Sequence, residues 1–112
     1  MDCIFCSIAQ HKTDADIVFE NDQVFVIKDI NPKAKVHLLA IPKEHIVTFN
    51  DLTMDNFGVM SVLALAIKNV TEDFQIADSG YKVIANNGSN GGQAVPHLHL
   101  HILGGEPIRG VT

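Results

Sequence analysis

The sequence predicts an α+β fold, in which an antiparallel sheet of about five strands carries one long helix packed on it. Short runs of β-branched and aromatic residues, separated by turn residues, predict the strands. One longer segment with apolar residues at steps of three and four predicts the helix. The chain has 112 residues, of which 46% are hydrophobic, so we expect a single domain over residues 1–112.

The first half of the chain is expected to contain a short helix followed by three strands. Their ranges are residues 3–10 for the helix and 17–20, 23–29 and 36–41 for the strands. The dipeptide Asn21-Asp22, between the first two strand runs, is a turn signal and predicts a hairpin.

The long helix is expected to begin after Thr53, which is a suitable N-cap. Its apolar positions are Phe57, Met60, Leu63, Ala64, Ile67, Val70 and Phe74. Glu72 and Asp73 oppose the helix dipole, which favours an earlier end. Two further strands are expected at residues 81–86 and 97–103, joined by a loop of about ten residues.

Charge and hydropathy exclude several classes of protein. The formal net charge is -5, and no lysine or arginine occurs between Lys82 and Arg109, which argues against a nucleic-acid binder. The N-terminus lacks the features of a signal peptide, and the longest apolar run, residues 62–67, is too short to span a membrane. We therefore expect a cytoplasmic protein, in which the two cysteines are thiols or metal ligands.

Three of the six histidines, His97, His99 and His101, occupy alternate positions near the C-terminus. Side chains two residues apart on a strand stand about 6.6 Å apart on the same face, so the histidines share one face. Leu98, Leu100 and Ile102 share the other face. Neutral imidazole is both a nucleophile and a metal ligand. The spacing alone therefore leaves three interpretations open: a metal cluster, a nucleophile with acid–base partners, or a solvated polar face.

The loop that precedes the histidines, residues 86–93, is rich in glycine and asparagine. Glycines allow close approach of the backbone, and successive N–H groups in such turns can form an anion-binding nest. No Gly-Lys-Ser/Thr sequence follows, so the loop is not a Walker loop. Because this loop directly precedes the three histidines, we expect its backbone N–H groups to hold a phosphate next to them.

The stretch GQAVPHLHLHIL, residues 92–103, resembles the motif of the histidine triad (HIT) family. The stretch DINPKAKVHLLAIPKEHI, residues 29–46, resembles the nucleotide-binding half of the same family, and the branch most similar is that of the histidine triad nucleotide-binding proteins. The resemblance implies a homodimer with a sheet that continues across its interface. It also implies a nucleotidyl hydrolase or transferase that acts at the α-phosphate of purine nucleoside phosphoramidates or related nucleotides. No cofactor is implied for the chemistry.

The resemblance also implies a role for each of four histidines. His99 is the nucleophile, and its attack on phosphorus gives a nucleotidyl-histidine that water then cleaves. The backbone carbonyl of His97 orients the ring of His99. His101 contacts the phosphate oxygens or the leaving group, and His37 completes the site as a fourth histidine.

The nucleotide-binding residues implied by the resemblance come from both halves of the chain. Asp29 is expected at the ribose hydroxyls and Ile30 against the base. The phosphate and sugar are expected to meet Asn86, Gly92, Gln93 and the backbone at Val95, together with His99 and His101. Many relatives have serine where this chain has Ala94, which affects the choice of leaving group.

Cys3 and Cys6 have the spacing of half a zinc site. Some members of the triad superfamily, such as galactose-1-phosphate uridylyltransferases, complete such a site with two histidines. By this resemblance the remaining ligands are His45 and His97, in a closed structural site. A pair of free thiols and a redox pair are the alternatives.

Two other functions remain open from the sequence. One is a zinc-dependent hydrolase that uses His97, His99 and His101 as metal ligands. The other is a nucleotide-binding protein without catalytic activity.

Overall fold

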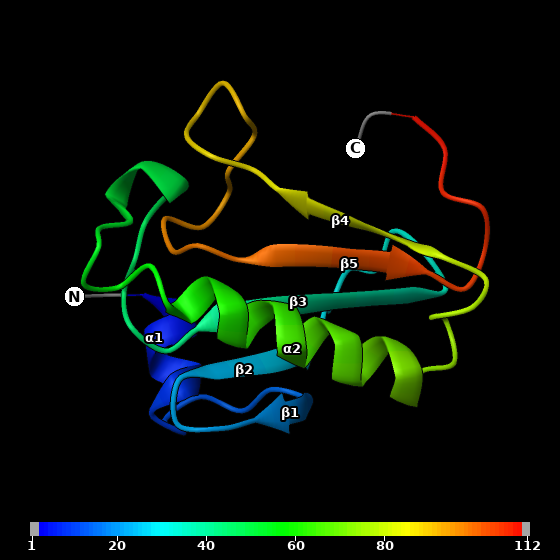
Figure 1. Ribbon diagram of the computed structural model, residues 1–112, viewed down its shortest axis with the longest axis horizontal. Helices are drawn as coiled ribbons and strands as arrows, with labels where there is room; N and C mark the ends of the chain where they lie inside the picture. The colour runs from blue at the N-terminus through cyan, green and yellow to red at the C-terminus, as the bar shows by residue number, and fades with distance from the viewer. Residues whose placement is uncertain (1–2, 111–112) are drawn as a thin grey trace.

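The computed structural model describes residues 3–110, which form one curved sheet with a helix on each face (Figure 1). The helices are α1 (Ile4–Ala9) and α2 (Val59–Asp73), with a short 3-10 helix, η1, at Phe49–Asp51. The strands are β1 (Ile17–Glu20), β2 (Val24–Lys28), β3 (Val36–Pro42), β4 (Tyr81–Ala85) and β5 (Leu100–Gly104). The predicted α+β class, with five strands and one long helix, is confirmed.

The sheet is antiparallel throughout, in the order β1-β2-β3-β5-β4. The side chain of Asn21 accepts hydrogen bonds from the backbone of Gln23 and Val24 in the predicted hairpin turn. His101 of β5 lies opposite Leu39 of β3 and Ile84 of β4. Because β5 lies between β3 and β4, His101 has a neighbouring strand on each side.

The strands β2 and β3 are buried on both faces, which explains their continuous apolar sequences. On one face, Val26 and Leu38 pack beneath Leu63 of α2. On the other face, Phe25 and Leu39 belong to a cluster that contains Phe5 and Ile8 of α1. The short helix α1 therefore covers a second core, next to the face that carries His101.

The long helix begins later than the sequence predicts. Thr53 caps a separate turn, because its hydroxyl accepts a hydrogen bond from the amide of Asp55, and the N-cap of α2 is Gly58. Phe57 is 59% exposed and does not belong to the buried face. The helix also continues to Asp73, so the expected earlier end is wrong.

The last strand also begins later than predicted, at Leu100. The amide of Leu98 bonds to the carbonyl of Ile46 at 2.6 Å, so residues 97–99 run beside the segment that follows β3 and not along β3 itself. His97 and His99 therefore precede the strand, and only His101 lies within it. None of the helices in the described part of the chain is long and apolar enough to cross a membrane.

Candidate active site

The ring of His99 is fixed by the backbone two residues earlier. Its Nδ1 lies 2.7 Å from the carbonyl oxygen of His97, and the ring is buried beside Phe5. Since a carbonyl oxygen only accepts, Nδ1 carries the proton and donates it. The lone pair of His99 is therefore on Nε2, the nitrogen available to attack an electrophile.

His37 and His101 form a second hydrogen-bonded pair, with tautomers set in the same way. The backbone N–H of Lys33 donates to Nδ1 of His37 at 3.0 Å, which places the His37 proton on Nε2. Nε2 of His37 lies 2.9 Å from Nδ1 of His101 and 3.3 Å from the Asp29 carboxylate. Nδ1 of His101 thus accepts, and its proton is on Nε2, as a donor.

Burial keeps both of these histidines neutral. Burial is the main cause that lowers the pKa of His101 to about 4, and the neighbouring His99 and His37 contribute to the same shift. Burial likewise lowers the pKa of His37, against the opposing effect of Asp29. At neutral pH the pair therefore offers hydrogen bonds and no positive charge.

These histidines line a cavity of about 290 Å³. Its lining residues are Lys33, His37, Ile84, Asn86, Gly92, Ala94, His99, His101 and Leu103. The structure thus brings together the predicted residues His37, Asn86, Gly92, His99 and His101.

The other predicted nucleotide-binding residues lie around this cavity and do not line it. Asp29 contacts His37 and accepts a hydrogen bond from the amide of Asn31. Ile30 is 91% exposed, so its side chain is free to cover a ligand. Val95 packs against the core beneath α1. The side chain of Gln93 accepts a hydrogen bond from the amide of Gly88 in the same loop.

The glycine-rich loop is held by its own polar side chains. Asn86 donates to the carbonyl of Gly91, while Gln93 accepts from the amide of Gly88 and donates to the carbonyl of Val47. A Cβ at Gly91 would lie 2.5 Å from the backbone oxygen of Asn87, so only glycine fits there. The loop therefore presents a defined backbone to the cavity.

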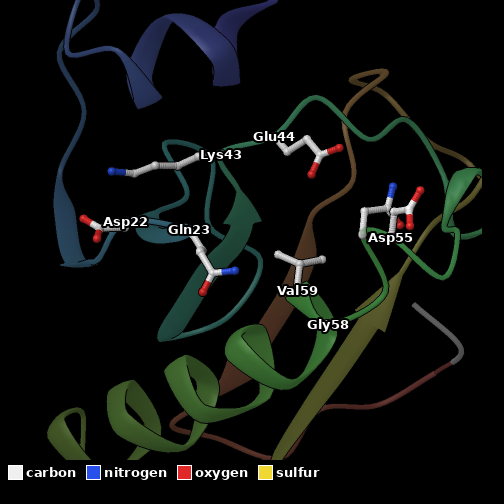
Figure 2. Close-up of a pocket in the computed structure, with 8 residues that line it drawn as sticks. Asp22, Gln23, Lys43, Glu44, Asp55, Gly58 and Val59 are labelled. Atoms are coloured by element: carbon white, nitrogen blue, oxygen red, sulfur yellow. The ribbon is translucent and has the colours of Figure 1, made fainter.

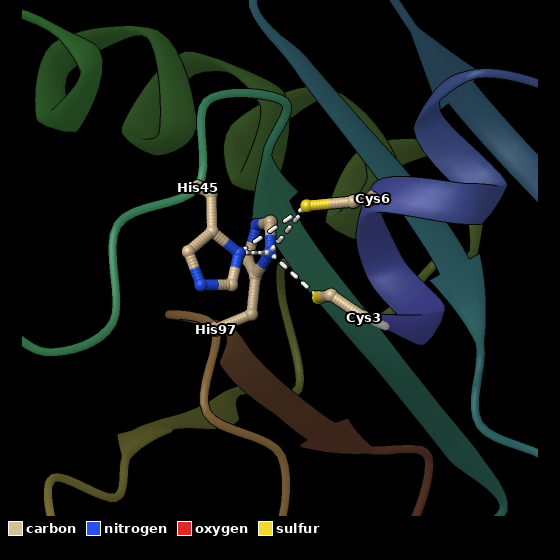
Figure 3. Close-up of side chains that lie close together, drawn as sticks. All are labelled: Cys3, Cys6, His45 and His97. Carbon is tan, nitrogen blue, oxygen red and sulfur yellow. Dashed lines mark hydrogen bonds between the residues drawn. The ribbon is translucent and has the colours of Figure 1, made fainter. Parts of the chain in front are cut away.

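Cys3, Cys6, His45 and His97 form the second site that the sequence predicts (Figure 3). Their donor atoms all lie within 4.8 Å of one another. Nδ1 of His97 is 3.3 Å from Sγ of Cys3 and 3.1 Å from Nδ1 of His45, and the His45 nitrogen is 3.2 Å from Sγ of Cys6. These separations are a few tenths of an ångström shorter than the edges of a tetrahedron with zinc at its centre, about 3.3–3.8 Å for Zn–N and Zn–S bonds of usual length, so a small movement of the side chains would admit the ion.

The tautomer of His97 also fits a metal. Its Nε2 donates to the carbonyl oxygen of Pro42 at 2.8 Å, which leaves the lone pair on Nδ1, toward the two thiols. Burial lowers the pKa of His97, so the ring is neutral, as a ligand requires. The four residues are thus suited to hold a metal ion.

The three alternating histidines do not form a metal cluster of their own. Among residues 3–110, the groups of side chains that could share a metal are the cysteine–histidine cluster and a set of Asp29, His37 and His101. His97 belongs to the first group, His101 to the second and His99 to neither. The geometry therefore does not support a zinc hydrolase with the triad as its ligands.

A separate cavity of about 240 Å³ lies at the N-terminal end of α2 (Figure 2). Its lining residues are Asp22, Gln23, Lys43, Glu44, Asp55, Asn56, Gly58 and Val59. Lys43 is paired with Glu20 at 2.7 Å. None of the predicted site residues lines this cavity.

Sequence reasoning missed three residues of the histidine cavity: Lys33, Ile84 and Leu103. It also missed Phe5, whose ring makes edge contacts with His97 and His99. Phe5 and Ile84 follow the pattern of ordinary core residues. The position of Lys33, two residues after Ile30-Asn31, carries no signal that it approaches a strand more than sixty residues away.

Comparison with known proteins identifies the family. A family model described as the HIT domain matches residues 10–108. A HIT-like protein of Chlamydia pneumoniae is 44% identical over 109 residues, which cover 97% of this chain and 98% of that protein. A protein of Escherichia coli named purine nucleoside phosphoramidase is 36% identical over 105 residues, which cover 94% of this chain and 88% of that protein.

Solved structures agree with the fold. A histidine triad protein from Clostridium difficile has a TM-score of 0.95 and 37% identity, with 100% of this chain and 97% of that chain covered. A HIT family hydrolase from Legionella pneumophila has a TM-score of 0.93 and 39% identity, with 96% of each chain covered. A zinc-bound histidine triad family protein from Mycobacterium smegmatis has a TM-score of 0.77 and 28% identity, with 93% of this chain and 75% of that chain covered. By its family match and its relatives, this chain belongs to the HIT domain family.

Proposed function

We propose that this protein is a hydrolase of nucleoside phosphoramidates, of the histidine triad nucleotide-binding branch, with His99 as its nucleophile. The observation that carries the proposal is the bond from Nδ1 of His99 to the carbonyl of His97, which leaves Nε2 as the free nitrogen of a ring that lines the cavity. The name of the Escherichia coli relative, a purine nucleoside phosphoramidase, supports the choice of substrate.

In the proposed reaction, Nε2 of His99 attacks the α-phosphorus and the bond from phosphorus to the amine breaks. The amine departs with a proton, and a nucleotidyl group remains on His99. Water then cleaves the bond between phosphorus and histidine, which releases a nucleoside monophosphate. Nε2–H of His101 donates to a phosphate oxygen or to the departing nitrogen. The amides of the loop at Gly92 face the phosphate, while Asp29 and Ile30 hold the ribose and base.

The test is incubation with adenosine 5'-phosphoramidate, with release of AMP and the mass of the intact chain as readouts. We expect AMP, and an adenylate adduct that maps to His99. His99→Ala should lose both, yet still bind AMP in calorimetry. The control His11→Ala removes an exposed histidine that pairs with Glu20, and it should keep full activity. Turnover by His99→Ala would contradict the proposal, and AMP binding without turnover in the unmodified protein would indicate a non-catalytic binding protein.

We also propose a structural zinc ion at Cys3, Cys6, His45 and His97. The separations of the four donor atoms and the tautomer of His97 support it, and the zinc-bound relative from Mycobacterium smegmatis is consistent with it. Zinc would tie α1 to the segment that precedes β5 (Figure 3). The two cysteines are not joined in a disulfide, which suits the cytoplasmic location that the sequence predicts.

A homodimer with a continuous sheet is the remaining part of the proposal. The strand β4 lies at the edge of the sheet, and two of its residues, Tyr81 and Val83, are 41% and 44% exposed. An edge strand with exposed apolar residues is suited to pair with a second copy. Light scattering should give twice the chain mass, and Val83→Pro, which removes an amide from β4, should give the mass of one chain. A dimer that persists in Val83→Pro would contradict this interface.

A further inference from the structure

We propose that Cys3 and Cys6 are a redox-sensitive pair, in which a hydroperoxide oxidises Cys6 and the product condenses with Cys3 to a reversible disulfide. This modification is separate from the hydrolysis proposed above. It ties the oxidation state of the thiols to the proposed metal site, because the disulfide consumes both sulfur donors of that site. Disulfides in cytoplasmic proteins are mostly transient and redox-sensing, so the pair is expected to be reduced at rest.

The backbone places the two thiols at a spacing that a disulfide spans. Cys3 is the N-cap of α1 and Cys6 is the third residue of this helix. The carbonyl of Cys3 accepts a hydrogen bond from the amide of Ser7, so Cys3 already follows the helical path. Residues three apart on a helix have Cα atoms about 5 Å apart, within the range of about 4.4–6.8 Å found in disulfides. The sulfur atoms lie within 4.8 Å of one another, so rotation of the side chains can join them without unwinding α1.

The two thiols differ in their access to solvent. Cys6 is half-buried, whereas Cys3 is only 8% exposed. A small oxidant such as hydrogen peroxide therefore reaches Cys6 first. The thiol of Cys3 donates to Nδ1 of His97 at 3.3 Å, since Nε2 of that ring donates to the carbonyl of Pro42. Cys3 is thus shielded from the oxidant and held inside the cluster, where it can meet the oxidised Cys6 (Figure 3).

The reaction proceeds in two balanced steps. The sulfur of Cys6 attacks one oxygen of hydrogen peroxide, the O–O bond breaks, and the other oxygen takes the thiol proton, which gives a sulfenic acid and water. The sulfur of Cys3 then attacks the sulfur of Cys6, the S–O bond breaks, and the hydroxyl leaves as water with the Cys3 proton. Two thiols thereby lose two hydrogens, and the peroxide is reduced to two water molecules. The chain contains two cysteines, so no other thiol of the same chain competes for the sulfenic acid.

Oxidation and metal binding exclude each other. A disulfide leaves two nitrogen donors, those of His45 and His97, out of the four in the cluster, and structural zinc requires four. In the oxidised chain, α1 is held by the apolar contacts of Phe5 and Ile8 with the second core. The carbonyl of His97 stays at Nδ1 of His99 in either state. Oxidation should therefore lower stability and leave the orientation of His99 intact.

The experiment treats the chain, purified without chelators, with a few equivalents of hydrogen peroxide. Remaining thiols are alkylated with iodoacetamide, and a chromogenic chelator follows the release of zinc. Trypsin yields both cysteines in one peptide, residues 1–12, because Lys12 is the first basic residue at which it cleaves. We expect this peptide to lose two hydrogens and take up no alkyl group, with one zinc ion released for each disulfide. The Tm should fall by more than about 10 °C, and dithiothreitol with zinc should restore it.

Cys3→Ser isolates the first step of the reaction. Its Cys6 should form a sulfenic acid that dimedone traps, and no disulfide should follow. If this variant does not fold, the unmodified chain treated with peroxide in the presence of dimedone reports the same intermediate. The matched control is Ser7→Ala, which keeps both thiols in the same helix and should oxidise as the unmodified protein does.

Three results would overturn the redox pair. They are full alkylation of both cysteines after peroxide, a sulfinic acid on Cys6 with Cys3 still alkylated, and a disulfide between two chains. A disulfide within a chain that carried no zinc at the start would support the pair and contradict the proposed metal site. Because no readout needs a substrate, failure of the proposed hydrolysis would leave these results unchanged.

Discussion

His97 connects two sites through two different parts of one residue. Its carbonyl oxygen lies 2.7 Å from Nδ1 of His99, while its ring nitrogen Nδ1 lies 3.3 Å from Sγ of Cys3. The backbone therefore orients the proposed nucleophile, and the side chain belongs to the proposed zinc site. Loss of the metal should act mainly on folding, because the carbonyl remains whatever the ring binds.

Cys6→Ser should accordingly lower stability far more than it lowers activity. Structural zinc contributes on the order of 10 kcal/mol, a large share of the stability of a small domain. We expect the Tm to fall by more than about 10 °C and the zinc content to fall well below one ion per chain. The kcat of the fraction that remains folded should change less than about threefold.

Metal analysis and calorimetry measure these changes, and Ser7→Ala, beside Cys6 in α1, is the control for the helix. Its side chain bonds to Thr13 and does not belong to the metal cluster, so its zinc content should be normal. If the unmodified protein, purified without chelators, contains far less than one zinc ion per chain, the site is not a zinc site.

The neutral state of His101 makes stability depend on pH. Its pKa is about 4 in the folded chain, below the usual 6.5, so between these values only the unfolded chain takes up the proton. The contribution of His101 is therefore present above pH 6.5 and is lost progressively as the pH falls to about 4. Urea unfolding of His101→Asn should show a smaller fall of stability over this range than the unmodified protein does, and equal slopes would contradict the assignment.

His37 is expected to act through His101, as a positioning residue. Its Nε2–H meets Nδ1 of His101 at 2.9 Å and so keeps the His101 proton on Nε2. His37→Phe removes this donor, and kcat should fall by about 10–100-fold with a smaller change of KM. His37→Gln, whose amide can donate, should recover part of kcat. Nitrogen chemical shifts of His101 should reveal a changed tautomer in His37→Phe, and unchanged shifts together with unchanged kcat would remove this role.

Local sequence signals predicted the elements better than their ends. Asn21 predicted the hairpin correctly because its side chain accepts hydrogen bonds from the backbone of the turn. The spacing of apolar residues by three and four positions predicted the helix α2. The start of α2 was placed too early because Phe57 continues the periodic pattern, although its side chain is 59% exposed. The alternating sequence extended the predicted strand to His97, but residues 97–99 are buried by contacts such as those of His97 with Phe5 and Pro42 and not by pairing along β3.

For the site as well, some residues could be predicted from the sequence and others could not. His37 and His101 are neighbours in the cavity because β3 and β5 pair antiparallel, and His99 lies beside them two residues before His101, where its ring is held by the carbonyl of His97. Lys33 could not be predicted, since its place depends on how the loop between β2 and β3 folds over His37. The roles given to the predicted residues stay predictions until the variants above are measured.

Gly91→Ala tests whether the shape of the loop matters to the site. The added Cβ would lie 2.5 Å from the oxygen and 2.9 Å from the nitrogen of the Asn87 backbone, so the loop must move. The bond from Asn86 to the Gly91 carbonyl should be lost with it. We expect kcat/KM for adenosine 5'-phosphoramidate to fall about tenfold or more, at a cost in stability of about 1–3 kcal/mol.

The matched control for this loop variant is Gly58→Ala at the N-cap of α2, where φ is -58° and an added Cβ meets no atom within 4 Å. This residue adopts an ordinary helical conformation, so alanine should leave stability unchanged or raise it by a few tenths of a kcal/mol. Its kcat/KM should equal that of the unmodified protein, because Gly58 lies outside the histidine cavity. Normal activity in Gly91→Ala would mean that the loop backbone does not hold the phosphate, and the anion would then depend on His99 and His101 alone.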